Sequence, residues 1–159
     1  VGTMNPEEGD LRPQLLDRFG LSVDIKGERD PKVRAEIVRK RLEFDDGPER
    51  YVRSRSEETE RLRRRIEDAA ARVRTVSIGP EVLDAVVTIT SHFGIDGHRA
   101  DIVMMKAARA NAAFEGRDRI VSDDIVAVAG LVLSHRMRRR PFEDSSIDRE
   151  ELEKCLKDL

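Results

Sequence analysis

The chain has 159 residues, enough for one domain of ordinary size with a sizeable buried core. Its 30 Lys and Arg residues nearly balance its 32 Asp and Glu residues, which argues against a uniformly basic nucleic-acid-binding protein. Aromatic residues make up only 4%, so aromatic-rich sandwiches or barrels are disfavoured and helices with charged faces are favoured. The single cysteine, Cys155, excludes an internal disulfide and fits a cytoplasmic protein, and no apolar run approaches the roughly 20 residues of a membrane span.

The first 30 residues combine loop signals with short periodic segments. A helical pattern covers residues 13–19, and it is followed by an alternation of apolar residues that predicts a strand, at Leu21, Val23 and Ile25. Residues 1–6 are interpreted as the end of a buried strand that runs into a loop, so the chain is expected to begin within a domain.

The next segment is expected to connect two parts of the molecule. Asp30 and Pro31 predict a helix start, with the aspartate as N-cap and the proline at the first helical position. Gly47-Pro48 interrupts the pattern, and residues 45–56 are predicted to form a mobile connector. From residue 57 to 74, apolar residues recur at helical spacing and predict a long amphipathic helix.

Three further helices are clearly punctuated along the rest of the chain. They are predicted at residues 80–93, 98–115 and 122–139, the last with Ser122 as N-cap, and the short loops between them indicate a compact bundle. Asp148 is expected to cap a final helix that carries Leu152, Leu156 and Leu159.

Arg99 occupies an electrostatically unusual position at the start of a predicted helix. A cation there is disfavoured by about 0.3 to 1 kcal/mol, because the first turn of a helix carries partial positive charge. A bound phosphate would offset this cost, since guanidinium and backbone N–H groups both bind it. An ion pair with Asp96 or Asp101 is the alternative explanation.

Arg12, Arg18 and Asn5 are further candidates near the N-terminus. The two arginines lie on or beside the short helix of residues 13–19, but Asp17 can simply neutralise Arg18. Asn5 can orient a water molecule or a phosphate oxygen, although an asparagine before a proline is also a common turn residue.

The remaining clusters have simpler explanations beside their functional ones. The arginines of 61–65 are interpreted as a solvated salt-bridged face, and those of 136–140 as a complement to a helix dipole. Both clusters could instead bind nucleic acid or an acidic protein. The histidines are not expected to bind metal, because no pair has the four-residue spacing of a helical zinc site, among His92, His98 and His135.

No glycine is followed by lysine, so the phosphate-binding loop G-x-x-x-x-G-K-[S/T] is absent from the chain. Several segments nevertheless resemble the ATPase subunit, subunit I, of magnesium chelatases, a family of AAA+ ATPases. The resemblance covers most of residues 1–143 and is carried by Val1–Leu21, Gly97–Asp101, Ala107–Ala110 and Leu133–Pro141.

The resemblance implies a role for each candidate residue. Asn5 matches the sensor 1 residue, which helps to position the attacking water, and Arg18 matches the arginine finger offered to ATP in the neighbouring subunit. Arg99 matches the sensor 2 arginine, which contacts nucleotide phosphate. Arg12 is an auxiliary phosphate-side arginine, and Asp17 is expected at the subunit interface, orienting Arg18.

The implied fold is mainly α, a helical AAA+ lid bundle preceded by the strand-and-helix remnant of an α/β ATPase core. Residues 1–30 would end the core, 31–74 connect, 75–140 form the lid and 141–159 form a tail helix. The implied cofactors are ATP and Mg²⁺, both needing an upstream part of the core. The implied partners are identical subunits in a hexameric ring and the other chelatase subunits, including the porphyrin-binding one.

The function implied is coupling of ATP hydrolysis to Mg²⁺ insertion into protoporphyrin IX for chlorophyll synthesis, and the chain alone is not expected to be active. Two alternatives remain open at this stage. One is another AAA+ task, in a cobalt chelatase or a chaperone-like ATPase. The other is a helical module that binds nucleic acid or an acidic protein through its arginine clusters.

Overall fold

A computed structural model describes residues 1–5, 9, 11–137, 152, 154 and 155. This part of the chain is mainly helical, which confirms the expected fold class. Its helices are α1 (Pro13–Leu16), α2 (Pro31–Asp46), α3 (Pro48–Ser54), α4 (Ser56–Arg72), α5 (Pro80–His92), α6 (Arg99–Phe114) and α7 (Ser122–Met137). None of the described helices is long and apolar enough to cross a membrane.

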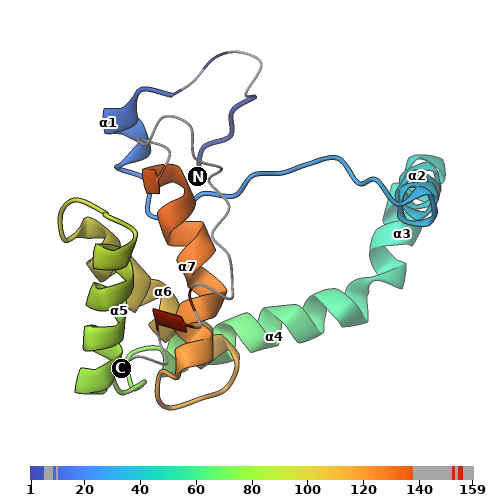
Figure 1. The fold of residues 1–159 in the computed structure, drawn as a ribbon. Coiled ribbons are helices and arrows are strands. Elements are labelled where there is room, and N and C mark those ends of the chain that lie inside the picture. Colours follow the sequence, from blue (N-terminus) through green and yellow to red (C-terminus); the bar gives the residue numbers. More distant parts are fainter. Residues whose placement is uncertain (6–8, 10, 138–151, 153, 156–159) are drawn as a thin grey trace.

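Helices α5, α6 and α7 form the bundle that contains the core (Figure 1). Their buried faces repeat every three or four residues, as an amphipathic helix requires. The largest fully buried side chains include Ile89 of α5, Met104 of α6, and Ile125 and Leu133 of α7.

The start of α7 is fixed by a buried carboxylate. Asp124 is fully buried, and its Oδ2 accepts a hydrogen bond from the backbone N–H of Val121 at 2.9 Å. Its Oδ1 accepts from Asn111 at 2.8 Å and pairs with Arg117. Ser122 is the first helical residue, and Asp124 rather than Ser122 supplies the side chain that caps the helix.

The loops before α5 and α7 are joined by a short backbone contact. Ser77 and Arg119 form an isolated parallel bridge, in which the N–H of Ser77 donates to Asp118 O at 2.8 Å. This is the only β-type pairing within the residues that the structure describes. It closes the end of the bundle at which α4 arrives.

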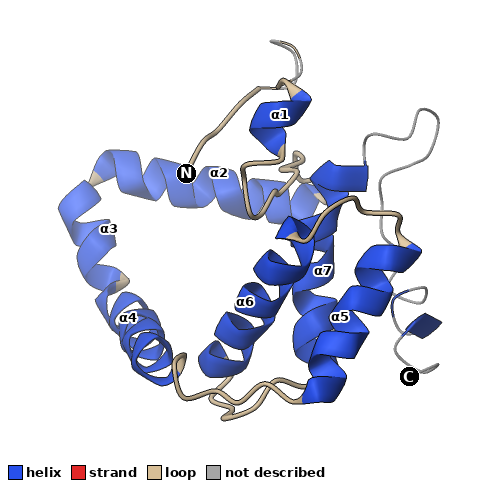
Figure 2. Ribbon diagram, turned by 90° about the vertical axis from the view of Figure 1, so that its left-hand side faces the viewer, coloured by secondary structure: helices blue, strands red, loops and turns tan. Residues whose placement is uncertain are grey.

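Helices α2, α3 and α4 form an arm that leaves the bundle (Figure 1). Asp30 caps α2 by accepting a hydrogen bond from the N–H of Lys32 at 2.7 Å, so the predicted helix start is confirmed. Figure 2 shows α2 and α3 connected by a bend and α4 leading from them to the bundle. Neither α2 nor α3 has a buried residue.

The segment 45–56, predicted as a mobile connector, is almost all helical. Gly47 ends α2, but Pro48 then occupies the first position of α3. A proline suits a helix start, since its φ is already helical and its missing N–H would have had no partner there. The glycine-proline pair therefore bends the arm without ending its helical character.

The strand predicted at 21–25 was also wrong. Leu21, Val23 and Ile25 are all exposed and lie in an extended segment. A strand needs a second extended segment to satisfy its backbone, and no described segment pairs with this one. The N–H of Ser22 donates instead to Leu131 O of α7 at 2.8 Å, which ties the segment to the bundle.

The end of the chain falls largely outside the described residues. Leu152 and Cys155 are both helical and buried, and they belong to the core cluster. The start expected at Asp148, the leucines at 156 and 159, and residues 138 and 139 of the predicted third helix lie outside that part.

Candidate functional site

The first turn of α6 is built around Asp101 and not around Arg99. Gly97 turns the chain into the helix with a φ of 80°, a conformation that other residues rarely adopt. Asp101 accepts a hydrogen bond from Thr90 Oγ1 of α5 at 2.6 Å, and His98 Nδ1 lies 3.4 Å from its other oxygen. Asp101 is therefore occupied by neighbours from α5 and from its own turn.

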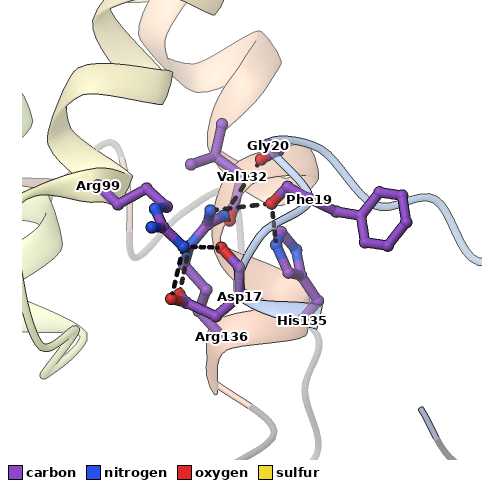
Figure 3. A network of polar contacts seen from close by, with 7 residues as sticks. All are labelled: Asp17, Phe19, Gly20, Arg99, Val132, His135 and Arg136. Carbon is purple, nitrogen blue, oxygen red and sulfur yellow. Dashed lines mark hydrogen bonds and ion pairs between the residues drawn. The ribbon is translucent and has the colours of Figure 1, made fainter. Parts of the chain in front are cut away.

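Arg99 does form an ion pair, but its partner is neither Asp96 nor Asp101. Its Nη1 donates to the backbone O and to Oδ2 of Asp17, both at 2.9 Å (Figure 3). Both side chains are partly exposed, at 53% for Arg99 and 40% for Asp17. The pair links α6 to the turn after α1, which explains how a cation is tolerated at this helix start.

Arg136 of α7 contacts the same turn, but its side chain is buried. Its side chain is only 5% exposed, and its Nη atoms donate to Phe19 O at 3.0 Å and to Gly20 O at 3.2 Å, as well as to Val132 O. Asp17 Oδ1 lies 3.8 Å from its Nε. Burial lowers the pKa of Arg136, while the charge of Asp17 opposes this effect.

His135 adds one more contact to this turn. Its Nε2 lies 3.1 Å from Phe19 O, so this nitrogen carries the proton and donates to the carbonyl. Three side chains, from α6 and α7, thus converge on the segment from Asp17 to Gly20 (Figure 3). We call this set the α1 clamp: Asp17, Arg99, His135 and Arg136.

The sequence prediction missed Arg136 and His135 as parts of this site. Arg136 was interpreted as a surface cation that complements a helix dipole. A signal was present, because Val128, Val132 and Arg136 continue the buried stripe of α7 at four-residue spacing. Its contacts with residues 116 and 117 positions away could not be found from a local pattern.

The other predicted site residues are not members of the clamp. Arg18 directly follows Asp17, is exposed, and makes no hydrogen bond or ion pair through its side chain to any described residue. Asp17 contacts Arg99 and Arg136 instead of Arg18. Arg12 and Asn5 are exposed on the segment before and at the start of α1, outside the contacts of the clamp.

The chemistry available here is recognition of anions. Arg18, Arg99 and Arg136 carry three positive charges against the single carboxylate of Asp17. Arg99 is half exposed at the N-terminal end of a 16-residue helix, where backbone N–H groups also attract phosphate. An incoming phosphate would compete with Asp17 for Arg99. Among the described residues there is no cluster of three or more His, Cys, Asp or Glu side chains suited to a metal ion.

The arginine cluster of α4 is in part the salt-bridged face that was predicted. Arg63 contacts Glu60 and Glu67, and Arg64 contacts Glu60, all at 2.6–2.9 Å on the exposed side of the helix. Arg65 turns to the other side and pairs with Glu115 at 2.7 Å.

Comparison with known proteins agrees with this arrangement. Residues 83–155, which span α6, α7 and most of α5, match the family model of the AAA lid domain. The fold also resembles a putative ATPase from Cytophaga hutchinsonii with a TM-score of 0.60, covering 95% of this chain and 49% of that one. At 18% identity this likeness shows the fold alone. Residues 83–155 are thus similar to the AAA lid domain.

Individual relatives give a more specific comparison than the family model does. It is 42% identical over 159 residues to a magnesium-chelatase subunit ChlI homolog of Methanocaldococcus jannaschii, and 44% identical over 144 residues to magnesium-chelatase subunit ChlI of Cyanophora paradoxa. These matches cover 100% and 91% of this chain, but only 44% and 42% of the two relatives. The chain is therefore similar, over nearly all of its length, to part of these magnesium-chelatase subunits, and it spans less than half of their own length.

Proposed function

We propose that this chain is the sensing and lid portion of an AAA+ motor subunit of a magnesium chelatase. In the assembled enzyme, ATP hydrolysis in a hexameric ring would drive insertion of Mg²⁺ into protoporphyrin IX, held by a partner subunit. The similarity to magnesium-chelatase subunits at 42% to 44% identity supports the family role. The observation that supports the site is the pairing of Asp17, the residue before Arg18, with Arg99 at the start of α6.

Within this proposal each arginine has a distinct task. Arg99 would bind nucleotide phosphate in its own subunit, and exposed Arg18 would reach the nucleotide of the neighbouring subunit. Asn5 would orient the attacking water, Arg12 would add a phosphate contact, and Asp17 would lie at the subunit interface. The guanidinium groups fit the phosphates of ATP, whereas the described residues offer no carboxylate cluster for the accompanying Mg²⁺.

The layout of the chain is part of the proposal. Residues 1–30 would end the ATPase core, 31–74 connect it to the lid at 75–140, and 141–159 form a tail. The absence of buried residues in α2 and α3 supports a connecting role for 31–74. The match to the AAA lid family runs to residue 155, past the proposed tail boundary. A cytoplasmic location is supported by the single cysteine.

The experiment uses the full-length protein and distinguishes the role of Arg18 from that of Arg99. Arg18→Ala should lower ATP turnover by about 10³-fold or more while leaving nucleotide affinity within a few-fold, because a finger acts on the transition state. Arg99→Ala should weaken nucleotide affinity as well. The matched control is Arg41→Ala, an exposed arginine of α2 that pairs only within its own helix.

Mixing the two variants tests the action between subunits. A ring that contains both variants holds sites with an intact Arg99 in one subunit and an intact Arg18 in its neighbour. We therefore expect the mixture to recover part of the ATP turnover that each variant lacks alone. Failure of the mixture to recover activity, with normal assembly, would sink the trans-acting role of Arg18.

The second candidate function is insertion of Co²⁺ in place of Mg²⁺. A protein of Mycobacterium tuberculosis without a chelatase name is 44% identical over 156 residues, and the chain covers only 25% of it, so this portion also occurs in a much longer protein. Insertion of Mg²⁺ and of Co²⁺ into porphyrin, measured by absorbance with the partner subunits present, decides between them. The 159-residue chain alone should hydrolyse no ATP.

A further inference from the structure

A second cluster of arginines surrounds a cavity at the far end of α6. The cavity has a volume of about 390 Å³ and lies between α4 and the C-terminal end of α6. Four arginines of α4 line it: Arg61, Arg64, Arg65 and Arg72. Residues 61, 65, 68 and 72 recur every three or four positions, so they share one face of the helix. We call this space the α4–α6 cavity.

One of these arginines is held rigidly in place. The guanidinium carbon of Arg65 lies 3.9 Å from the ring centroid of Phe114, a cation–π contact. Its Nε donates to Phe114 O at 3.1 Å and its Nη2 to Glu115 Oε1 at 2.7 Å. One wall of the cavity is therefore organised before any ligand arrives, which lowers the entropy cost of binding.

The charges around the cavity do not balance. The carboxylates that line it are those of Asp68 and Glu115, against four guanidinium groups. Glu60 holds Arg64 at 2.9 Å, but it lies outside the lining. The side chains of Arg61 and Arg72 make no hydrogen bond or ion pair with any residue that the structure describes, and Arg72 is only partly exposed.

Complementing the helix dipole explains only part of this arrangement. The C-terminal end of α6 carries about half a negative charge, and Arg65 already contacts it. Arg61 and Arg72 donate no hydrogen bond to this helix end. A surface for nucleic acid is also disfavoured, since Glu60 and Glu67 neutralise the arginines on the outer side of α4 and interrupt the basic stripe.

We propose that the α4–α6 cavity binds a small anion of the phosphate type. Guanidinium groups donate two parallel hydrogen bonds to such an oxyanion, and unpartnered Arg61 and Arg72 supply the missing partners for its charge. Gly116 lies directly beside the guanidinium of Arg72, since a Cβ there would come within 3.2 Å of Arg72 Nη1. The volume lies within the range of small-molecule sites.

This site is distinct from the α1 clamp. Arg99 and Phe114 stand at opposite ends of α6, about 22 Å apart at 1.5 Å of rise per residue. The proposal therefore does not depend on the proposed chelatase function. The two sites can be told apart by observing their arginines separately.

The test is a titration of the ¹⁵N-labelled 159-residue chain with inorganic pyrophosphate at constant ionic strength, followed by NMR of the arginine Nε–H groups. We expect saturable shifts at Arg61, Arg65 and Arg72, with none at Arg12, Arg18 or Arg99. A second titration with ADP shows whether a phosphate ester is accepted as well as the free anion. Shifts confined to Arg12, Arg18 and Arg99 would assign the anion to the clamp and refute the proposal.

Two variants with opposite expected effects on pyrophosphate affinity complete the test. The double change Arg61→Gln and Arg72→Gln should weaken pyrophosphate binding at least about tenfold. Glu115→Gln should strengthen it several-fold, because it removes a competing carboxylate and keeps an amide oxygen that can accept the hydrogen bond of Arg65. This gain does not depend on the double variant folding. The control Arg34→Gln with Arg39→Gln removes the same charge from α2 and should change little. Equal loss in this control, weaker binding in Glu115→Gln, or binding of DNA but not of pyrophosphate would each overturn the proposal.

Discussion

The bundle and the arm each contain a helix of 16 residues, but different forces hold these two helices in place. Helix α6 in the bundle and α2 in the arm both have 16 residues. Five residues of α6 are buried, whereas none of α2 is. The difference teaches that helix length and capping do not by themselves place a helix in a core.

Within the arm, helix α2 depends on local interactions. Asp30 caps α2, Glu36 pairs with Lys40 at 2.7 Å, and Arg41 pairs with Asp45 at 2.8 Å. Exposed pairs of this kind contribute only a few tenths of a kcal/mol each. The apolar residues Val38 and Leu42 line an open groove on α2. Burial in the bundle thus stabilises its helices far more than these contacts stabilise the arm.

The largest expected effect comes from truncating the same residue type in each region. Leu133 of α7 is fully buried, whereas Leu42 of α2 is 59% exposed. Leu133→Ala should lower the free energy of unfolding by about 3 to 4 kcal/mol, and Leu42→Ala by less than about 0.5 kcal/mol. Urea denaturation followed by circular dichroism measures both. Similar losses for the two variants would show that the arm packs against something as firmly as the bundle does.

A smaller effect is expected at the clamp that ties residues 17–20 to the bundle. Arg136→Met removes the donors to Phe19 O and Gly20 O, and should cost about 2 kcal/mol because those carbonyls lose buried partners. Hydrogen exchange of the Ser22 amide, which donates to Leu131 O, should become faster. The control Arg99→Met removes a half-exposed pair and should cost less than about 1 kcal/mol. If both variants behaved alike, the burial of Arg136 would not matter.

The smallest expected effect is a pH dependence confined to α4, where the arm meets the bundle. Hydrogen bonds from Arg63 and then Arg64 lower the pKa of Glu60 below its ordinary value. The contribution of this carboxylate is therefore complete above the ordinary glutamate pKa and is lost as pH falls through the lowered one. Protection factors of the α4 amides, which correct for the pH dependence of intrinsic exchange, should fall on that acid side. Glu60→Gln should remove the change, and an unaltered pH profile in that variant would count against this assignment.

The sequence predicted the bundle well because its punctuation is local. Pro80 starts α5, Gly94 follows its end, and Gly116 follows α6, so the predicted bounds of these helices lie within one or two residues of those observed. The same kind of signal failed at Gly47-Pro48, where it was interpreted only as an interruption. Proline both ends one helix and starts another, and composition does not reveal which effect dominates.

The candidate site could be predicted only in part, because its contacts are long-range. A cation at the start of α6 drew attention to Arg99, and the expectation of an ion pair was reasonable. Its partner Asp17 lies 82 residues away, and no local spacing identifies such a pair. The strand expected at Leu21, Val23 and Ile25 failed for the same reason, since alternation defines two faces but cannot supply a neighbouring strand.

The attachment of α4 to the bundle has a consequence for how the arm can move. Its C-terminal half is held by the bundle, where Ala69 and Val73 pack against the core and Arg65 contacts the end of α6. The helix has 17 residues and is about 25 Å long. A rotation of the bundle is therefore transmitted along α4 to the rest of the arm. Turning the bundle by about 10° would move the far end of α4 by about 4 Å, and it would carry α3 and α2 with it.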